Sequence, residues 1–102
     1  MTPPQVHADD TIETAVRRLV ESDLSALPVV DARERFVGVF GKHMNREHVE
    51  VGPDHSDVQV AEIFLHHRVL IVPVVDDDRH VVELIARREF FRELAQRFLA
   101  PS

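Results

Sequence analysis

The sequence contains no cysteine and only three glycines among its 102 residues. The absence of cysteine excludes disulfide bonds, thiolate zinc sites and cysteine nucleophiles, and it is compatible with a reducing, intracellular setting. So few glycines limit close approach of the backbone to a ligand. Neither a phosphate-binding glycine loop nor a Gly-x-Ser-x-Gly elbow is present. The sequence therefore predicts a protein that is not an enzyme.

Long hydrophobic runs are also missing, since no stretch approaches the ~18 apolar residues of a membrane-spanning helix. The segment Met1-Thr2-Pro3-Pro4 has no basic region followed by an apolar one, which argues against export. We therefore expect a cytoplasmic protein without membrane contact.

Basic charge is scarce, with 12 Lys and Arg against 18 Asp and Glu and a net charge of −6. Binding along a phosphate backbone needs a basic footprint, so no nucleic-acid partner is expected. Arginines do gather near the C-terminus, as Arg87, Arg88, Arg92 and Arg97. The solvated face of a helix explains them, an anion site is the alternative, and nucleic-acid binding through this helix is the least favoured function.

Seven histidines and the run Asp76-Asp77-Asp78 raise the question of a metal site. No two histidines have the His-x-x-x-His spacing that places both on one helix face. The aspartate run lacks the alternating ligands and glycine of a calcium loop, and a hairpin turn explains it. The sequence predicts no metal site.

The chain contains an internal repeat. Leu27-Pro28-Val29-Val30-Asp31 returns as Val72-Pro73-Val74-Val75-Asp76 at a constant offset (73 − 28 = 45). The same offset aligns Val6 with Val51 and Thr11 with Ser56. A fixed period decides the architecture before any single residue is interpreted, and two copies predict one pseudo-symmetric module rather than a solenoid.

The first copy predicts a short strand near Val6, a helix capped at Asp9-Asp10-Thr11, and strands over 26–30 and 36–40 joined by a polar turn. The helix carries one apolar stripe, made of Ile12, Ala15, Val16, Leu19 and Val20. Residues 41–48 are at best weakly helical.

The second copy predicts a helix with a Ser56–Gln59 capping box, strands over 69–75 and 81–85, and a helix over 87–100. Its first helix is apolar around more of its circumference, through Val58, Val60, Ala61, Ile63, Phe64 and Leu65. A helix between two strands implies a parallel crossover, and a short turn implies an antiparallel hairpin. The expected class is α+β, with two β-α-β-β-α repeats, residues 1–48 and 49–102, packed sheet to sheet.

With these elements in order, the chain resembles a tandem pair of cystathionine β-synthase (CBS) domains, called a Bateman module. The matching segments are Asp10-Thr11-Ile12-Glu13-Thr14-Ala15, the two Pro-Val-Val-Asp phrases and Phe36-Val37-Gly38-Val39. The resemblance covers nearly the whole chain. It implies a non-catalytic regulatory module, usually a homodimer, that often binds adenosine-type nucleotides between the repeats and requires no cofactor.

Nucleotide-binding members of this family carry a Gly-x-x-Thr/Ser-x-x-Asp pattern after the second hairpin strand. Its aspartate accepts both ribose hydroxyls in charge-assisted bonds. In the first repeat the hydroxyl position is Gly41, followed by Lys42, and the carboxylate position is Met44. Methionine cannot accept a diol, so the first site is predicted to be degenerate.

The second repeat keeps a carboxylate at this position, as Glu89, while the hydroxyl position is Ala86 and Glu83 replaces the glycine. If this site binds a nucleotide, Glu89 would hold the sugar, and Arg87 and Arg88 would face phosphate at a helix start. The candidate ligand residues are Glu89, Arg87, Arg88, Ala86, Val72 and Pro73.

An excess of apolar area marks a candidate surface for self-association, made of Ile63, Phe64, Phe90, Phe91, Leu94 and Phe98. The leading hypothesis is a regulatory or scaffolding module that acts through dimerisation and contact with a regulated protein, with weak or degenerate nucleotide sites. The alternative is a sensor of AMP, ADP, ATP or S-adenosylmethionine that uses the second-repeat cleft.

Overall fold

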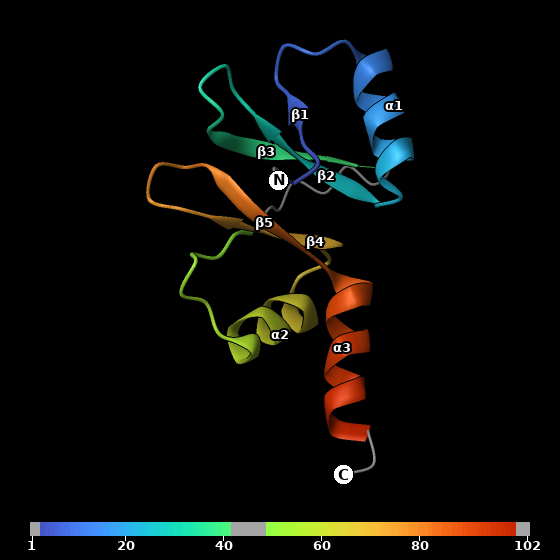
Figure 1. Ribbon diagram of the computed structural model, residues 1–102, viewed down its shortest axis with the longest axis vertical. Helices are drawn as coiled ribbons and strands as arrows, with labels where there is room; N and C mark the ends of the chain where they lie inside the picture. The colour runs from blue at the N-terminus through green and yellow to red at the C-terminus, as the bar shows by residue number, and fades with distance from the viewer. Residues whose placement is uncertain (1–2, 42–48, 100–102) are drawn as a thin grey trace.

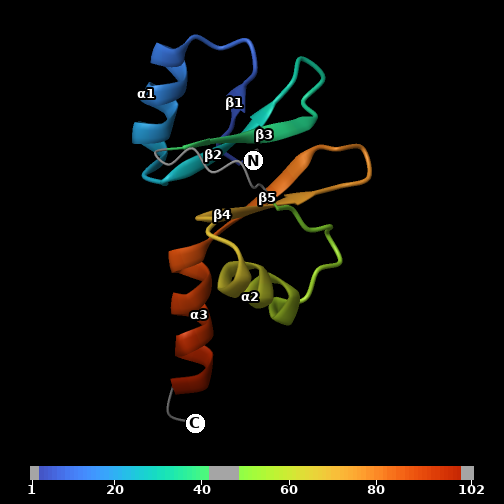
Figure 2. The ribbon, with the colours of Figure 1, turned by 180° about the vertical axis from the view of Figure 1, so that it is seen from behind.

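The computed structural model describes residues 3–41 and 49–99, in which two small sheets lie against each other with helices on their outer sides (Figure 1). Seen from behind, α1 covers the first sheet, while α2 and α3 lie on the far side of the second (Figure 2). The elements in chain order are β1 (Val6–His7), α1 (Ile12–Ser22), β2 (Ala26–Val30), β3 (Phe36–Gly41), α2 (Asp57–His66), β4 (Ile71–Val75), β5 (Val81–Ala86) and α3 (Arg87–Leu99).

The two sheets repeat one topology. The first has the order β1-β2-β3, with β1 parallel to β2 and β3 antiparallel to it. In the second, β4 and β5 form the antiparallel hairpin. Val51 makes a parallel bridge to Val74, which is equivalent to the pairing of Val6 in β1 with Val29 in the first repeat. Both hairpins have a register shift at equivalent positions, between Val29 and Val30 in the first and between Val74 and Val75 in the second. The predicted α+β architecture of paired repeats is confirmed for the described residues.

Local capping explains where the helices begin. Thr11 accepts a hydrogen bond from the backbone N–H of Thr14 at 3.1 Å, and Ser56 accepts one from Gln59 at 3.2 Å. These hydroxyls satisfy backbone donors that the first helical turn leaves without a partner. Asp23 then ends α1 in the left-handed region at φ 58°. The predicted final helix of the first repeat falls on residues 42–48, outside the described part of the chain.

Three groups of buried side chains form the core. One lies inside each repeat, around Leu27 in the first and Phe64 in the second. The third lies between the repeats and is itself symmetric, because its members pair at the offset of 45: Val30 with Val75, and Phe36 with Val81. All of β4 is buried, as its continuous apolar sequence predicted.

The helices depart from prediction at several apolar positions. On α1 only Ala15 and Leu19 are buried, whereas the other three members of the predicted stripe, Ile12, Val16 and Val20, are exposed. On α2, Val58 and Leu65 are exposed as well. A single layer of sheet can cover only part of a helix, so a wide apolar stripe leaves one edge in solvent. No helix among residues 3–41 and 49–99 is long and apolar enough to cross a membrane.

Candidate functional site

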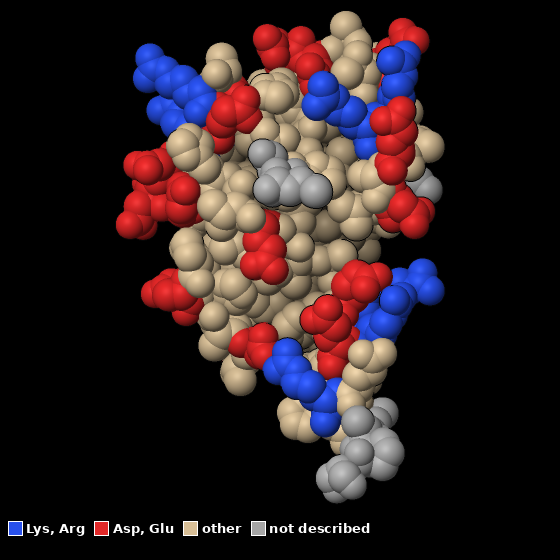
Figure 3. Space-filling model, in the orientation of Figure 1, with Lys and Arg blue, Asp and Glu red and all other residues tan. Residues whose placement is uncertain are grey.

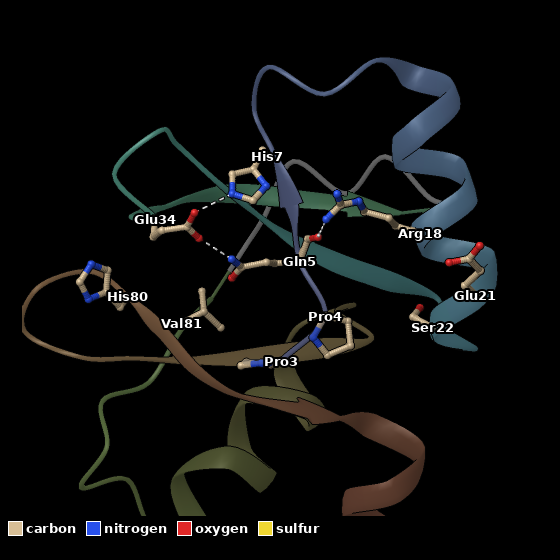
Figure 4. Close-up of a pocket in the computed structure, with 10 residues that line it drawn as sticks. All are labelled: Pro3, Pro4, Gln5, His7, Arg18, Glu21, Ser22, Glu34, His80 and Val81. Atoms are coloured by element: carbon tan, nitrogen blue, oxygen red, sulfur yellow. Dashed lines mark hydrogen bonds and ion pairs between the residues drawn. The ribbon is translucent and has the colours of Figure 1, made fainter. Parts of the chain in front are cut away.

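An open cleft of about 1080 Å³ lies where the two repeats meet, and we call it the inter-repeat cleft (Figure 4). The first repeat contributes the segment before β1, β1 itself, one side of α1 and the β2–β3 turn. The second repeat contributes the end of the β4–β5 turn and the start of β5. The lining residues are Pro3, Pro4, Gln5, His7, Arg18, Glu21, Ser22, Glu34, His80 and Val81. Its size would suit a nucleotide-sized molecule.

Glu34 is the centre of the polar groups in the inter-repeat cleft. Its carboxylate accepts a hydrogen bond from Gln5 Nε2 at 2.5 Å and lies 2.7 Å from His7 Nε2. Arg18 in turn donates to the backbone oxygen of Gln5 at 3.3 Å. Figure 4 shows these contacts as a chain that runs from the β2–β3 turn through β1 to α1.

The contact between His7 and Glu34 shifts both groups toward their charged forms. The hydrogen bond to Glu34 raises the pKa of His7 above its ordinary value of 6.5, against a smaller lowering by burial. The same bond lowers the pKa of Glu34 below its ordinary value of 4.5. The two groups therefore form an ion pair at pH values between the lowered pKa of Glu34 and the raised pKa of His7.

The second repeat has a counterpart of this contact with different chemistry. The offset of 45 relates Gln5 to Glu50 and Glu34 to Arg79, and Arg79 donates to Glu50 at 2.7 Å. Both turn residues have positive φ, 63° at Glu34 and 69° at Arg79. The repeats thus use one backbone device to tie the segment before the first strand to the hairpin turn, but only the first employs a histidine.

The six predicted ligand residues do not belong to the inter-repeat cleft. Arg87 donates to the backbone oxygen of Phe64 at 2.6 Å, and its guanidinium lies 5.5 Å from the centre of the Phe91 ring. These contacts hold the Arg87 side chain against the end of α2 and the Phe91 ring. Arg87 does border a smaller cavity of about 450 Å³ between the end of α2 and β4.

The other five predicted ligand residues are divided between core and surface. Val72 and Pro73 are fully buried and offer a ligand no surface. Ala86 is half-buried at the end of β5, where it pairs with Ile71. Arg88 and Glu89 are exposed on α3, and Glu89 forms an ion pair with Arg92 at 3.5 Å. The structure therefore does not bring these six residues together around one hollow.

In the degenerate first site, only Gly41 can be placed, because Lys42 and Met44 lie outside the described residues. Gly41 ends β3 opposite Ala26. A Cβ atom there would lie 2.9 Å from both the Ala26 Cβ and the Ser25 backbone oxygen. The strand pairing thus leaves no room for a threonine or serine at the hydroxyl position.

Of the six residues of the predicted self-association surface, one is buried, four are half-buried and one is exposed. Phe64 is 1% exposed, and the rings of Phe90 and Phe91 lie 5.7 and 5.9 Å from its centre. Ile63 packs against the same cluster. Phe64 is therefore a core residue, and its assignment to a surface was wrong, because the rings of Phe90 and Phe91 on α3 pack against it. Leu94 is half-buried, and Phe98 remains 79% exposed.

The aspartate run forms the β4–β5 turn, as predicted. Asp76 Oδ1 accepts backbone hydrogen bonds from Asp78 at 3.0 Å and His80 at 2.9 Å. Asp31 accepts the same two bonds from Arg33 and Arg35 in the first repeat. Asp76, Asp78 and His80 do bring possible metal-binding atoms within 4.8 Å of one another. The matching turn in the first repeat has the same backbone hydrogen bonds, so these bonds explain the position of the Asp76 carboxylate without a metal ion.

The polar residues of the inter-repeat cleft were missed by sequence analysis. Their grouping depends on the path of the segment before β1, which the sequence does not reveal. The repeat contained one usable signal, because Glu34 and Arg79 occupy the same turn position with opposite charge. On the face in Figure 3, acidic and basic side chains are interspersed, and no continuous basic surface is visible there.

Comparison with known proteins agrees with this geometry. The family model described as CBS domain matches residues 1–44 and again residues 41–96. Staphylococcus aureus OpuCA is similar in structure, with a TM-score of 0.78 and 21% identity, covering 95% of this chain and 96% of that one. CBSX2 in complex with AMP has a TM-score of 0.79 and 21% identity, covering 96% and 94%.

A curated relative is the inosine-5'-monophosphate dehydrogenase of Methanocaldococcus jannaschii, at 24% identity over 85% of this chain. The chain spans only 21% of that enzyme's length. Because the two family matches together cover almost all of the sequence and coincide with the two structural repeats, the chain belongs to the CBS domain family and is a tandem CBS pair, a regulatory kind of module.

Proposed function

We propose that this CBS pair regulates or scaffolds another activity through self-association and contact with a partner protein, and that its second-repeat nucleotide site is degenerate. The observation that carries the proposal is the position of Arg87. Its guanidinium is held by the Phe64 carbonyl and two phenylalanine rings. A group with these partners would have to give them up before it could bind a phosphate, which makes binding less favourable.

The remaining residues of the second-repeat site add support. Glu89, the only carboxylate at the ribose position of either repeat, is exposed and paired with Arg92. Val72 and Pro73, the strand residues assigned to the same site, are enclosed in the core. A pocket that recognises a ribose phosphate needs several polar groups that converge on one cavity, and these residues do not form such a group.

A second candidate function is the binding of an adenine nucleotide in the inter-repeat cleft. The cleft has room for such a molecule, and Arg18, His7 and His80 supply basic groups to it. The similar structure of CBSX2 was obtained in complex with AMP, which supports this class of ligand. Against it, Glu21 and Glu34 also line the cleft and would repel a phosphate.

Thermal unfolding in the presence of AMP, ADP, ATP, S-adenosylmethionine or NAD separates the two candidates. A ligand at 100 times its dissociation constant adds about 2.7 kcal/mol to the free energy of unfolding. For a domain of this size that raises the melting temperature by about ten degrees or more. The proposal expects no shift with any of these compounds, together with a dimer in sedimentation velocity.

Two variants identify the site if a shift does occur. A shift lost in Arg18→Ala and kept in Glu89→Ala would establish binding in the inter-repeat cleft. The opposite pattern would establish the second-repeat site and contradict the proposal. A strict monomer at high protein concentration would remove self-association from the proposed mechanism.

A further inference from the structure

Three side chains tie the segment before β1 to the β2–β3 turn, and we call their contacts the first-repeat latch. Glu34, in the turn, accepts a hydrogen bond from Gln5 Nε2 at 2.5 Å and lies 2.7 Å from His7 Nε2. All three residues line the inter-repeat cleft, together with Pro3 and Pro4 of the same segment (Figure 4). The segment is therefore one wall of the cleft, and its position sets how widely the cleft opens.

The backbone holds this segment to the sheet over a short length only. β1 has two residues and pairs with β2, whereas residues 3–5 belong to no strand. Val6 is 3% exposed and anchors β1 in the core of the first repeat. Because residues 3–5 have no strand partner, the side chains of the first-repeat latch contribute a large share of what keeps them in place.

The strength of the first-repeat latch depends on the charge of His7. The hydrogen bond to Glu34 raises the pKa of His7 above its ordinary value of 6.5 and burial lowers it, while the charge of Asp10 raises it and that of Arg18 lowers it. The His7 bond also lowers the pKa of Glu34, to which the charge of His80 in the second repeat adds a smaller lowering. A charge-assisted hydrogen bond is about twice as strong as a neutral one. The latch is therefore strongest below about pH 6.5 and weakens as pH rises through the raised pKa of His7.

The turn that carries Glu34 is also where the first repeat contacts the second. The next residue, Arg35, forms an antiparallel bridge with His80. The backbone N–H of Phe36 then donates to the Arg79 oxygen at 2.6 Å. A change in how the turn is held at Glu34 therefore reaches the second repeat within two residues.

The second repeat has the equivalent tie without a histidine. Arg79 occupies the position of Glu34 and donates to Glu50 at 2.7 Å, while Gly52 stands where the first repeat has His7. The two repeats thus hold the same segment in the same way, but only the first includes an imidazole that can gain or lose a proton.

We propose that the first-repeat latch is a proton-operated switch: it is closed while His7 is protonated, and loss of that proton releases residues 3–5 and widens the inter-repeat cleft. This inference rests on the proposed function, for which it names the signal. A regulatory module with a degenerate nucleotide site needs another input, and the latch makes that input the proton. Since Val6 keeps β1 in the core, the release is confined to the residues before β1.

Nuclear magnetic resonance of the full chain tests the switch with two readouts. A pH titration of the imidazole carbons gives the pKa of His7, and the Cα order parameter of Gln5 gives the mobility of the segment. This order parameter is expected to fall from about 0.85, typical of a rigid backbone, to below about 0.6 between pH 5.5 and pH 8.5. The midpoint of the fall should coincide with the measured pKa of His7. The order parameter of Glu50, in the equivalent segment of the second repeat, should not change over this range.

Two matched variants assign the effect to the first-repeat latch. Glu34→Gln removes the charge and keeps the length of the side chain, so the pKa of His7 should fall toward 6.5 and the Gln5 order parameter should no longer depend on pH. Each unit of that fall corresponds to a tenfold difference in latch closure between charged and neutral His7. Glu50→Gln, the same change in the second repeat, should leave both readouts as in the wild type.

Two results would overturn the switch. One is a Gln5 order parameter that stays constant in the wild type while His7 titrates, because the segment is then held without the charge of His7. The other is a pH dependence that persists in Glu34→Gln. A monomer in sedimentation with a working switch would contradict the proposed function alone, whereas a dimer in which Gln5 does not respond to pH would contradict only this inference.

Discussion

At the scale of single residues, Glu34 links segments of the first repeat that are far apart in the sequence. It lies in the β2–β3 turn at a positive φ of 63°, yet its carboxylate contacts Gln5 before β1 and His7 within it. These contacts join segments 27 and 29 residues apart. A turn residue that would otherwise point into solvent thereby fixes the position of the segment that borders the inter-repeat cleft.

The His7–Glu34 pair should make stability depend on pH. The pKa of His7 is raised by its hydrogen bond to Glu34, so this contribution is complete below about pH 6.5 and is lost as pH rises through the raised value. The pKa of Glu34 is lowered by the same bond, so its contribution is present above about pH 4.5 and is lost as pH falls through the lowered value. Urea unfolding at a series of pH values should therefore show Glu34→Gln to be most destabilising near pH 5.5 and much less so at pH 9.

The second repeat supplies the control for this experiment. Glu50→Gln breaks the equivalent contact with Arg79, which contains no histidine. Its effect on the free energy of unfolding should not decline between pH 5.5 and pH 9. Equal effects of Glu34→Gln at the two pH values would contradict the assigned role of His7.

At the scale of helices and strands, local signals carried the prediction well. The constant offset of the repeat and the capping hydroxyls of Thr11 and Ser56 are properties of neighbouring residues, so they could be predicted without knowledge of the packing. The side of α1 that faces the sheet could not be predicted, because periodicity gives the width of an apolar stripe but not which edge is covered. The contact of Arg87 with the Phe64 backbone oxygen could not be predicted either, because the two residues are 23 positions apart in the sequence.

The pairing of β2 with β3 predicts a marked difference between two glycines of the same strand. A Cβ atom at Gly41 would lie 2.9 Å from the backbone oxygen of Ser25, whereas one at Gly38 would meet nothing within 4 Å. Gly41→Ala should therefore lower the free energy of unfolding by about 1 to 3 kcal/mol, because either strand must shift to admit the methyl group. Gly38→Ala should be neutral or slightly stabilising in the same denaturant titration. Equal stability of the two variants would mean that β3 ends before Gly41.

At the scale of the whole molecule, the two repeats are joined mainly by one shared core and a short stretch of backbone contact. Val30, Phe36, Val75 and Val81 form the shared core. Beside it, the backbone N–H of Phe36 donates to the Arg79 oxygen at 2.6 Å, and the Arg79 guanidinium lies 5.8 Å from the centre of the Phe36 ring. Each repeat therefore depends on the other to complete its burial, and the pair should unfold as a single cooperative unit.

Phe36 is the largest side chain in this shared core and is 4% exposed, so its truncation tests directly how much the shared core stabilises the pair of repeats. Phe36→Ala removes contacts to both repeats and should lower the free energy of unfolding by about 3 to 5 kcal/mol. Phe98→Ala is the matched control, because the same chemical change at a side chain that is 79% exposed should cost little. Circular dichroism against denaturant should show one transition in the wild type and in the Phe98→Ala variant. Two separate transitions in the wild type, or equal costs for the two truncations, would show that the repeats are stable independently of their shared core.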